Sequence, residues 1–222
     1  MQLTDLGIIR QEKFVMKRIL FTCLAFCLLC LPASAQEVAE GVNFVRLAEP
    51  QSVQTGQKIE VLELFWYKCP HCYKLEPYLK RWLKNKPDNV EYVRMPAILN
   101  NSWAFDAHAF YTMEALDLTE LLHDAYFNAI HEERKRIFTP EHFADWAATH
   151  GADRQAVLET FTSFGVSTKV TYASDMTRRY QTNGVPTIIV DGTYQTKVSM
   201  AGGSNELIDL INHLAAKAQE ER

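Results

Sequence analysis

The feature that most constrains the fold is an apolar run that leads directly into two cysteines and a helix. Residues 59–66 read IEVLELFW, almost continuously apolar, as in a central strand buried on both faces. Residues 69–72 read CPHC, and apolar side chains then recur at helical spacing as far as Leu83. We therefore expect a buried strand, a short turn and a helix over 69–84, kinked where Pro77 removes an amide.

The rest of the chain places a long helical block inside an α/β pattern. Residues 42–47 and 90–95 have the pattern of strands. Strand character returns at 187–190, where Asp191-Gly192 forms a two-residue hairpin turn to 193–196. A last helix covers 205–219. This order predicts an α/β domain interrupted by an all-helical insertion.

Residues 100–182 have helical spacing throughout. Five helices are expected, and each has a residue suited to its first turn: Ser102, Thr119, Thr139, Asp153 and Ser167. The third should stop at Gly151. The fourth, with Phe161 and Phe164 on its apolar face, should stop before Gly165. We interpret these apolar stripes as core and assign no cofactor to them.

The start of the chain has the pattern of a secretory signal. Three of the five cysteines lie in the apolar run 19–31, which follows Lys17-Arg18 and precedes Ala33-Ser34-Ala35. This pattern predicts a signal peptide over 1–35, cut after Ala35, with Met16 as the expected true start. A membrane anchor is disfavoured because the run is short. A lipoprotein signal is disfavoured because Leu29, not a small residue, precedes Cys30.

Composition excludes several classes of protein. With 47% hydrophobic and 23% charged residues the chain is globular, not disordered. The net charge of −4 falls to −6 without residues 1–35, which carry four basic and two acidic residues. An acidic chain is not expected to bind nucleic acid. After this removal only Cys69 and Cys72 remain, in a protein that we expect to be exported. A disulfide between them would close a ring too small to stabilise the fold much, so we expect their role to be chemical.

The position of these cysteines predicts a redox site. A helix N-terminus offers free amides and about half a positive charge to Cys69. Pro70 fits the first turn, and His71 can add a second positive charge. These neighbours should lower the pKa of Cys69, while Cys72, one turn further, suits the resolving role. A stabilised thiolate favours the reduced pair, so its disulfide should be a strong oxidant.

Metal binding is the alternative use of a cysteine pair. A zinc site needs about four ligands, and no second pair with zinc-site spacing survives the removal of 1–35. Residues 131–135 read HEERK, which lacks the second His of a zinc-protease motif. The other histidines are interpreted as surface or packing residues: His108, His123, His142, His150 and His213. We expect no metal and no cofactor.

The residues around the cysteines resemble a known family. Residues 65–73 (FWYKCPHCY), with Gly184-Val185-Pro186-Thr187 downstream, resemble DsbA, the bacterial periplasmic thiol:disulfide oxidase family of the thioredoxin superfamily. The resemblance covers essentially all of the chain after residue 35. It implies a thioredoxin-like α/β fold with an inserted all-helical domain: 36–99 and 183–222 form the thioredoxin-like domain, and 100–182 the insertion.

The resemblance also implies roles for particular residues. Pro186 matches the cis-proline that faces the redox pair, and the backbone of Val185 should pair with an extended substrate segment. Glu63 resembles the family's buried acid, with Arg94 as its partner where better-known members carry Lys. A guanidinium does not give up its proton, which puts a proton-transfer role for Arg94 in doubt. The alternative is that Glu63 is a surface strand residue.

The expected function is oxidation of dithiols in the periplasm. A monomer would pass its Cys69–Cys72 disulfide to unfolded exported proteins with free thiols, through a mixed disulfide at Cys69. The resemblance implies a DsbB-type, quinone-linked membrane oxidase as the partner that restores the disulfide. One alternative is a disulfide isomerase or reductase, against which we weigh His71, Val185 and the lack of an N-terminal dimerisation module. Another is a redox-inactive peptide-binding chaperone, which the intact cysteines disfavour.

Overall fold

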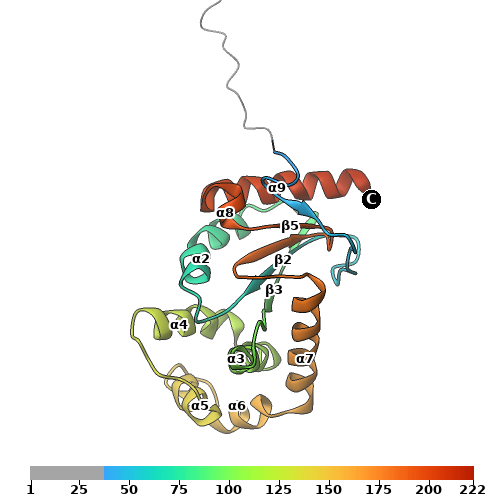
Figure 1. Ribbon diagram of the computed structural model, residues 1–222. Coiled ribbons are helices and arrows are strands. Elements are labelled where there is room, and N and C mark those ends of the chain that lie inside the picture. The colour runs from blue at the N-terminus through green and yellow to red at the C-terminus, as the bar shows by residue number, and fades with distance from the viewer. Residues whose placement is uncertain (1–37) are drawn as a thin grey trace, which may run out of the picture. The chain divides into compact units, whose positions relative to one another are not determined.

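The structure, a computed structural model that describes residues 38–222, is built on a mixed sheet of five strands (Figure 1). The strands are β1 (Val45–Arg46), β2 (Ile59–Phe65), β3 (Val90–Pro96), β4 (Thr187–Val190) and β5 (Tyr194–Thr196). Their order is β1-β5-β4-β2-β3, with only β2 and β3 parallel. All of β2 is buried, as predicted for a central strand. The predicted signal peptide, its cleavage site and Met16 lie outside the described residues.

One face of the sheet is covered by α2 (Pro70–Leu83) and α9 (Ser204–Glu221). Ile59 and Val61 of β2 contribute to the core on this side, together with apolar residues of both helices. The predicted helix over 69–84 is confirmed, and it continues through Pro77. The short helix α8 (Val198–Ala201), which precedes α9, was not predicted.

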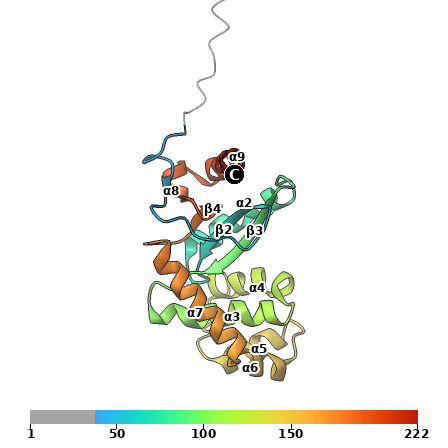
Figure 2. The same cartoon turned by 90° about the vertical axis from the view of Figure 1, so that its right-hand side faces the viewer.

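The helical block lies at one end of the sheet and covers its other face (Figures 1 and 2). Its helices are α3 (Ala104–Ala115), α4 (Thr119–His131), α5 (Pro140–Ala148), α6 (Arg154–Phe161) and α7 (Phe164–Arg179). Leu62 and Leu64 of β2 pack in the core that these helices share. The long helix α7 leads from the block back towards the sheet, so the chain re-enters the α/β part at β4.

Two of the predicted helix starts are confirmed by side-chain caps. Thr139 Oγ1 accepts from the N–H of His142 at 3.2 Å, and Asp153 Oδ1 accepts from the N–H of Ala156 at 2.7 Å. Both side chains satisfy an amide that has no partner within the helix. The helix that Thr119 was expected to open does begin at Thr119.

Two other predicted starts are wrong. At Ser102 the side chain that caps is that of Asn100, which accepts from the Ser102 N–H at 3.0 Å and opens the 3-10 turn η1 (Asn101–Trp103). The last helix of the block begins at Phe164, not near Ser167, because the Ser163 hydroxyl accepts from the Val166 N–H. Phe164 was predicted to be core, but at this first turn its side chain is 87% exposed.

The predicted turn at Asp191-Gly192 does join β4 to β5, but the connection is three residues long instead of two, because Val190 pairs with Tyr194. Asp191 and Gly192 both have positive φ, 51° and 61°, as such a turn requires. Gly192 also lies against the backbone of Gln51, where an added Cβ would come within 2.0 Å of the carbonyl oxygen. Only glycine fits both conditions at this position.

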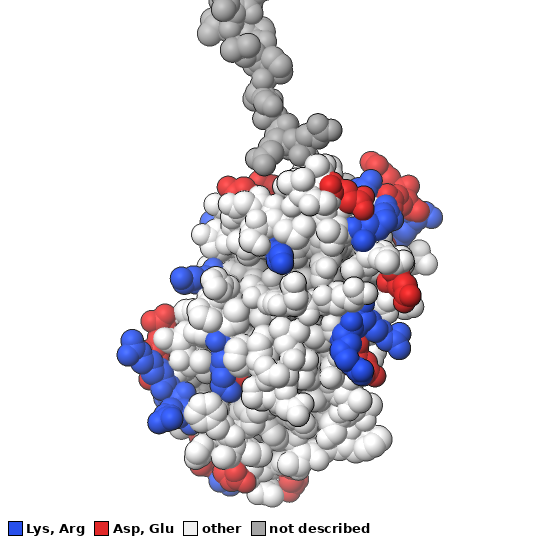
Figure 3. Space-filling model, viewed as in Figure 1, with Lys and Arg blue, Asp and Glu red and all other residues white. Residues whose placement is uncertain are grey.

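Charged side chains are dispersed on the surface drawn in Figure 3. Basic and acidic groups lie mostly towards the edges of this face, and its centre is largely uncharged. Among residues 38–222, no helix combines the length and the apolar character that a membrane crossing needs.

Candidate active site

The two cysteines lie at the start of α2, a few residues after the end of the buried strand β2. Cys69 is the residue before the first helical turn, and Pro70 occupies the first position of that turn. Cys69 is 7% exposed and Cys72 is fully buried, while Pro70 and His71 are exposed. Both cysteines are free thiols in this structure. An incoming sulfur would therefore meet Cys69 before Cys72.

The loop before β4 lies against Cys69. The Val185–Pro186 peptide bond is cis, as the resemblance implied. The Cys69 thiol donates to the Val185 carbonyl oxygen at 3.4 Å, a normal separation for a sulfur donor. Val185 is half-buried and Pro186 buried. The fold thus brings together two segments that are 116 residues apart in sequence.

The surroundings of the two thiols separate their pKa values. The Cys72 thiol, the backbone amides of Cys72 and His71 and the His71 side chain all favour the Cys69 thiolate. They outweigh burial and lower the pKa of Cys69 to about 5. Burial, followed by the neighbouring Cys69 and Glu63, raises the pKa of Cys72 well above its ordinary value. Of the two thiols, Cys69 is therefore the one that ionises readily, and Cys72 holds its proton.

Glu63 is a buried acid, so its alternative reading as a surface residue is wrong. It lies opposite Arg94 in the β2–β3 register, with Oε2 3.8 Å from Arg94 Nε, and it accepts a hydrogen bond from the Tyr92 hydroxyl. Its other oxygen, Oε1, has no hydrogen-bond partner. Burial, then the charge of Glu76, raises the pKa of Glu63 to about 8, so the carboxyl is mostly protonated at neutral pH.

A second acid in this network, Glu76, was not predicted from the sequence. Arg94 donates to Glu76 Oε2 at 3.1 Å, and His123 Nε2 lies 3.3 Å from Glu76 Oε1. Burial favours a neutral Glu76, but His123 and Arg94 outweigh it and hold the pKa below its usual value. His123 is buried as well, and Tyr67 holds its other ring nitrogen. The available signal was an acid four residues after Cys72, on the buried side of the helix.

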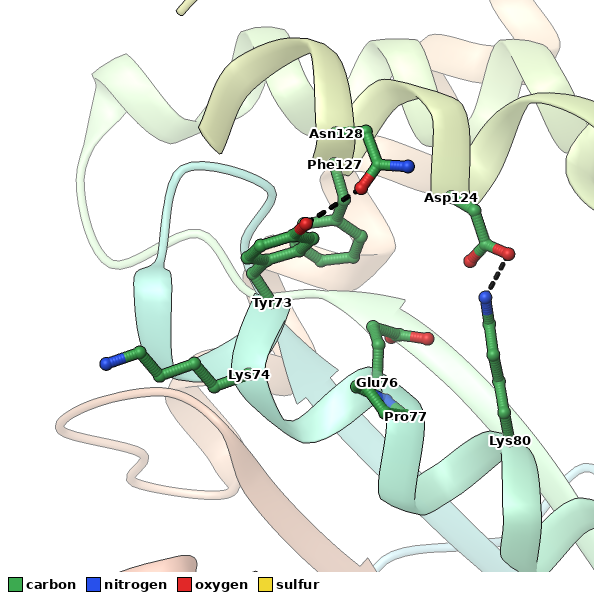
Figure 4. A pocket seen from close by; sticks show the side chains of 8 residues that line it. All are labelled: Tyr73, Lys74, Glu76, Pro77, Lys80, Asp124, Phe127 and Asn128. Atoms are coloured by element: carbon green, nitrogen blue, oxygen red, sulfur yellow. Dashed lines mark hydrogen bonds and ion pairs between the residues drawn. The ribbon is translucent and has the colours of Figure 1, made fainter. Parts of the chain in front are cut away.

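A pocket of about 450 Å³ opens between α2 and α4 beside this network (Figure 4). Glu76 and Asp124 line this pocket, and together with the buried His123 they offer ligand atoms within 4.8 Å of one another, the group of described residues best placed to hold a metal. Each carboxylate already has a cation, because Glu76 pairs with Arg94 and Asp124 with Lys80. We therefore assign no metal to this pocket.

The segment before Cys69 is tied to the helical block. His131 Nε2 lies 2.8 Å from the carbonyl oxygen of Tyr67, and its ring stacks on Tyr73. Trp66 and Lys68 both bond to Asp106 of α3. Asp106 was not singled out from the sequence, and His131 was noted only as the start of the HEERK run, because contacts between a loop and distant helices leave no local pattern.

A thioredoxin-like fold with a dithiol at a helix N-terminus, facing a cis-proline loop, defines a thiol:disulfide oxidoreductase of the thioredoxin superfamily. A family model described as DSBA-like thioredoxin domain matches residues 92–215. The thiol:disulfide interchange protein DsbA of Pseudomonas aeruginosa PAO1 is 38% identical over 84% of this chain and 89% of its own. That of Azotobacter vinelandii is 36% identical over 82% and 85%.

Solved structures agree with the sequence comparison. The crystal structure of Pseudomonas aeruginosa DsbA has a TM-score of 0.81 and 37% identity, over 84% of this chain and 97% of its own. The oxidoreductase NmDsbA1 of N. meningitidis has a TM-score of 0.73 and 27% identity, over 82% and 95%. The chain belongs to the DsbA family.

Proposed function

We propose that this protein is a dithiol oxidase that passes its Cys69–Cys72 disulfide to exported proteins in the periplasm. The observation that carries this proposal is the separation of the two thiol pKa values, about 5 for Cys69 and well above the ordinary value for Cys72. A dithiol with one stabilised thiolate favours the reduced state, so its disulfide gives up its bond readily.

The reaction proceeds in two exchanges. A substrate thiolate attacks Cys69 Sγ, the Cys69–Cys72 bond breaks, and Cys72 leaves and takes up a proton. The second substrate thiolate then attacks the substrate sulfur of the mixed disulfide and expels the Cys69 thiolate. Two electrons pass from substrate to enzyme, and the substrate keeps the new disulfide. The low pKa of Cys69 makes it a good leaving group in the second exchange.

Neighbouring groups assist these exchanges. His71 and the backbone amides at the start of α2 stabilise the Cys69 thiolate, while Pro70 presets the first turn. Glu63, protonated at neutral pH, is suited to exchange a proton with Cys72. Arg94 acts by its charge alone, since it holds Glu76 and lies beside Glu63.

The substrate binds as an extended chain beside Cys69. Val185, whose carbonyl oxygen lies 3.4 Å from the thiol, offers its backbone to a substrate strand, and Pro186 fixes the loop. Such a contact recognises the backbone of the substrate instead of particular side chains, so it suits unfolded proteins with free thiols. A DsbB-type quinone-linked membrane oxidase would restore the disulfide. The protein would act as a monomer, after removal of residues 1–35, with segments 36–99 and 183–222 enclosing a helical domain over 100–182.

The test compares three activities side by side: oxidation of reduced ribonuclease, reactivation of scrambled ribonuclease and reduction of insulin. The oxidised protein should be most active in the first, and Cys69→Ser should abolish that activity. Cys72→Ser, the matched variant, has no disulfide to donate and should also fail to oxidise ribonuclease, but its Cys69 thiolate should still attack glutathione disulfide, expel one glutathione thiolate and keep the other glutathione as a mixed disulfide, because no Cys72 thiol is present to release it. Faster reactivation of scrambled ribonuclease than oxidation of the reduced enzyme would indicate an isomerase and contradict the proposal.

A further inference from the structure

Asp106 of α3 is a fully buried acid that the exchanges described above do not use. Two of its three hydrogen-bond donors belong to residues 66–69, which we call the redox segment. Its Oδ2 accepts from Trp66 Nε1 at 2.6 Å and from Lys68 Nζ at 2.9 Å. Its Oδ1 accepts from Lys68 Nζ at 3.1 Å and from the Tyr126 hydroxyl at 3.2 Å. Two of these three donors stand within three residues of Cys69.

Asp106 and Lys68 form an ion pair in which each charge stabilises the other. An isolated buried carboxylate would be costly. Burial does raise the pKa of Asp106, while Lys68 and the hydrogen bonds from Trp66 and Tyr126 oppose that shift. The Lys68 ammonium lies 4.9 Å from the ring centre of Phe138, and its side chain is only 22% exposed. The cation is thus fixed to the helical block.

The redox segment is fixed by the same contacts. The Trp66 ring, whose Nε1 is held by Asp106, stacks on Trp103 at 4.0 Å with the ring planes nearly parallel. The Trp66 carbonyl oxygen in turn accepts from the Cys69 N–H at 3.0 Å. A chain of direct contacts therefore leads from Asp106 to the backbone of the nucleophile.

Lys68 is the residue immediately before Cys69, and a cation near a thiolate lowers the thiol pKa. Asp106 supplies an equal negative charge at hydrogen-bond distance, so the pair acts on Cys69 almost as a neutral group. We propose that Asp106 is a positioning residue of the redox site, which holds residues 66–69 against the helical block and cancels the charge of Lys68, so that the disulfide oxidises less strongly than Lys68 alone would make it. This inference rests on the proposed function of the Cys69–Cys72 pair.

The test measures the equilibrium of the full chain with glutathione and the pH titration of Cys69, for the wild type and Asp106→Asn. The asparagine oxygen can still accept from Trp66 and Lys68, and its NH₂ group can donate to the Tyr126 hydroxyl, so the packing is kept and the charge is lost. The equilibrium should shift at least threefold towards reduced protein, and the pKa of Cys69 should fall. The double variant Lys68→Gln/Asp106→Asn, in which both charges are absent, should return to within twofold of the wild type.

The contrary results are equally distinct. If Asp106→Asn lowers only the melting temperature and leaves the equilibrium constant and the Cys69 titration unchanged, Asp106 is purely structural. If the equilibrium shifts towards oxidised protein, the effect of the Asp106 charge is opposite to the one proposed. If Asp106→Asn does not fold, Lys68→Gln alone should shift the equilibrium at least threefold the other way, and no shift would overturn the proposal. Exchange with glutathione needs no oxidase activity towards proteins. A failure of the proposed function would therefore show in the ribonuclease assays, and a failure of this inference in the glutathione equilibrium.

Discussion

Among single residues, Cys69 stands out by its lowered pKa, because the groups around it stabilise the thiolate rather than the thiol. The Cys72 thiol, the backbone amides of Cys72 and His71, and the His71 side chain favour the Cys69 thiolate, whereas Glu63 lies buried on β2. The position of Cys69 and the sign of its pKa shift could be predicted from the sequence, since both follow from a CPHC segment at a helix start. The network of Glu76 and His123 could not, because it depends on which side chains of α2, α4 and β3 face one another.

Replacing His71 by serine should weaken the oxidant. His71 favours the thiolate, which exists only in the reduced state, so its removal destabilises that state selectively. A charge at a helix terminus contributes up to about 2 kcal/mol, and 30 mV in a two-electron couple corresponds to about 1.4 kcal/mol. The potential should therefore fall by some tens of millivolts, measured against glutathione. The exposed His142 on α5 is the control, and an equal change in His142→Ser would refute the assignment.

Replacing Glu63 by glutamine should stabilise the protein in a pH-dependent way. Because the folded-state pKa of Glu63 is raised to about 8, the carboxyl must take up a proton on folding at neutral pH, a cost that is absent below its unfolded pKa near 4.5. Glu63→Gln removes this titration. The difference in unfolding free energy between variant and wild type should move in favour of glutamine from pH 4 to pH 8 in urea titrations. A constant difference across this range would contradict the raised pKa.

Among the elements, the order of strands and helices could be predicted, but helix starts within the helical block only partly. Thr139 and Asp153 were recognised because each directly precedes its helix as a side-chain cap. Only Ser167 was predicted to open α7, because Gly165 suggested a break after Phe164, and Ser163 was not considered. The structure decides for Ser163, whose hydroxyl accepts from Val166. The local sequence does not separate Ser163 from Ser167 as a cap, whereas a helix that starts at Phe164 places Val166 in the core.

Replacing each serine in turn tests this choice. Ser163→Ala leaves an amide of the first turn of α7 without its partner and should lower the free energy of unfolding by about 1 kcal/mol. Ser167→Ala, inside the helix, should cost little, because alanine is the better helix former. Urea unfolding of the two variants measures both effects. A larger loss in Ser167→Ala would place the start of the helix where the sequence suggested it.

In the molecule as a whole, the low pKa of Cys69 links redox state, pH and stability. In the reduced protein Cys69 is ionised above a pKa of about 5, whereas in the unfolded chain it keeps its proton up to about pH 9. Between these values the unfolded state binds one more proton, so the free energy of unfolding rises with pH. A depressed pKa contributes stability that is lost as pH falls towards 5, while the oxidised protein has no such thiol to titrate.

The free energy of unfolding of the reduced protein should therefore rise relative to that of the oxidised protein by about 1.4 kcal/mol per pH unit between pH 6 and 8. Urea unfolding of both forms at pH 6, 7 and 8 measures this gap. Groups other than the two thiols are common to both forms and largely cancel in the difference, and Cys72 keeps its proton in the folded protein throughout, since its pKa is raised. Reduced Cys69→Ser, the control, should show no such slope. A gap that stays constant with pH in the wild type would mean that Cys69 is not ionised at neutral pH, and the oxidising strength would then need another cause.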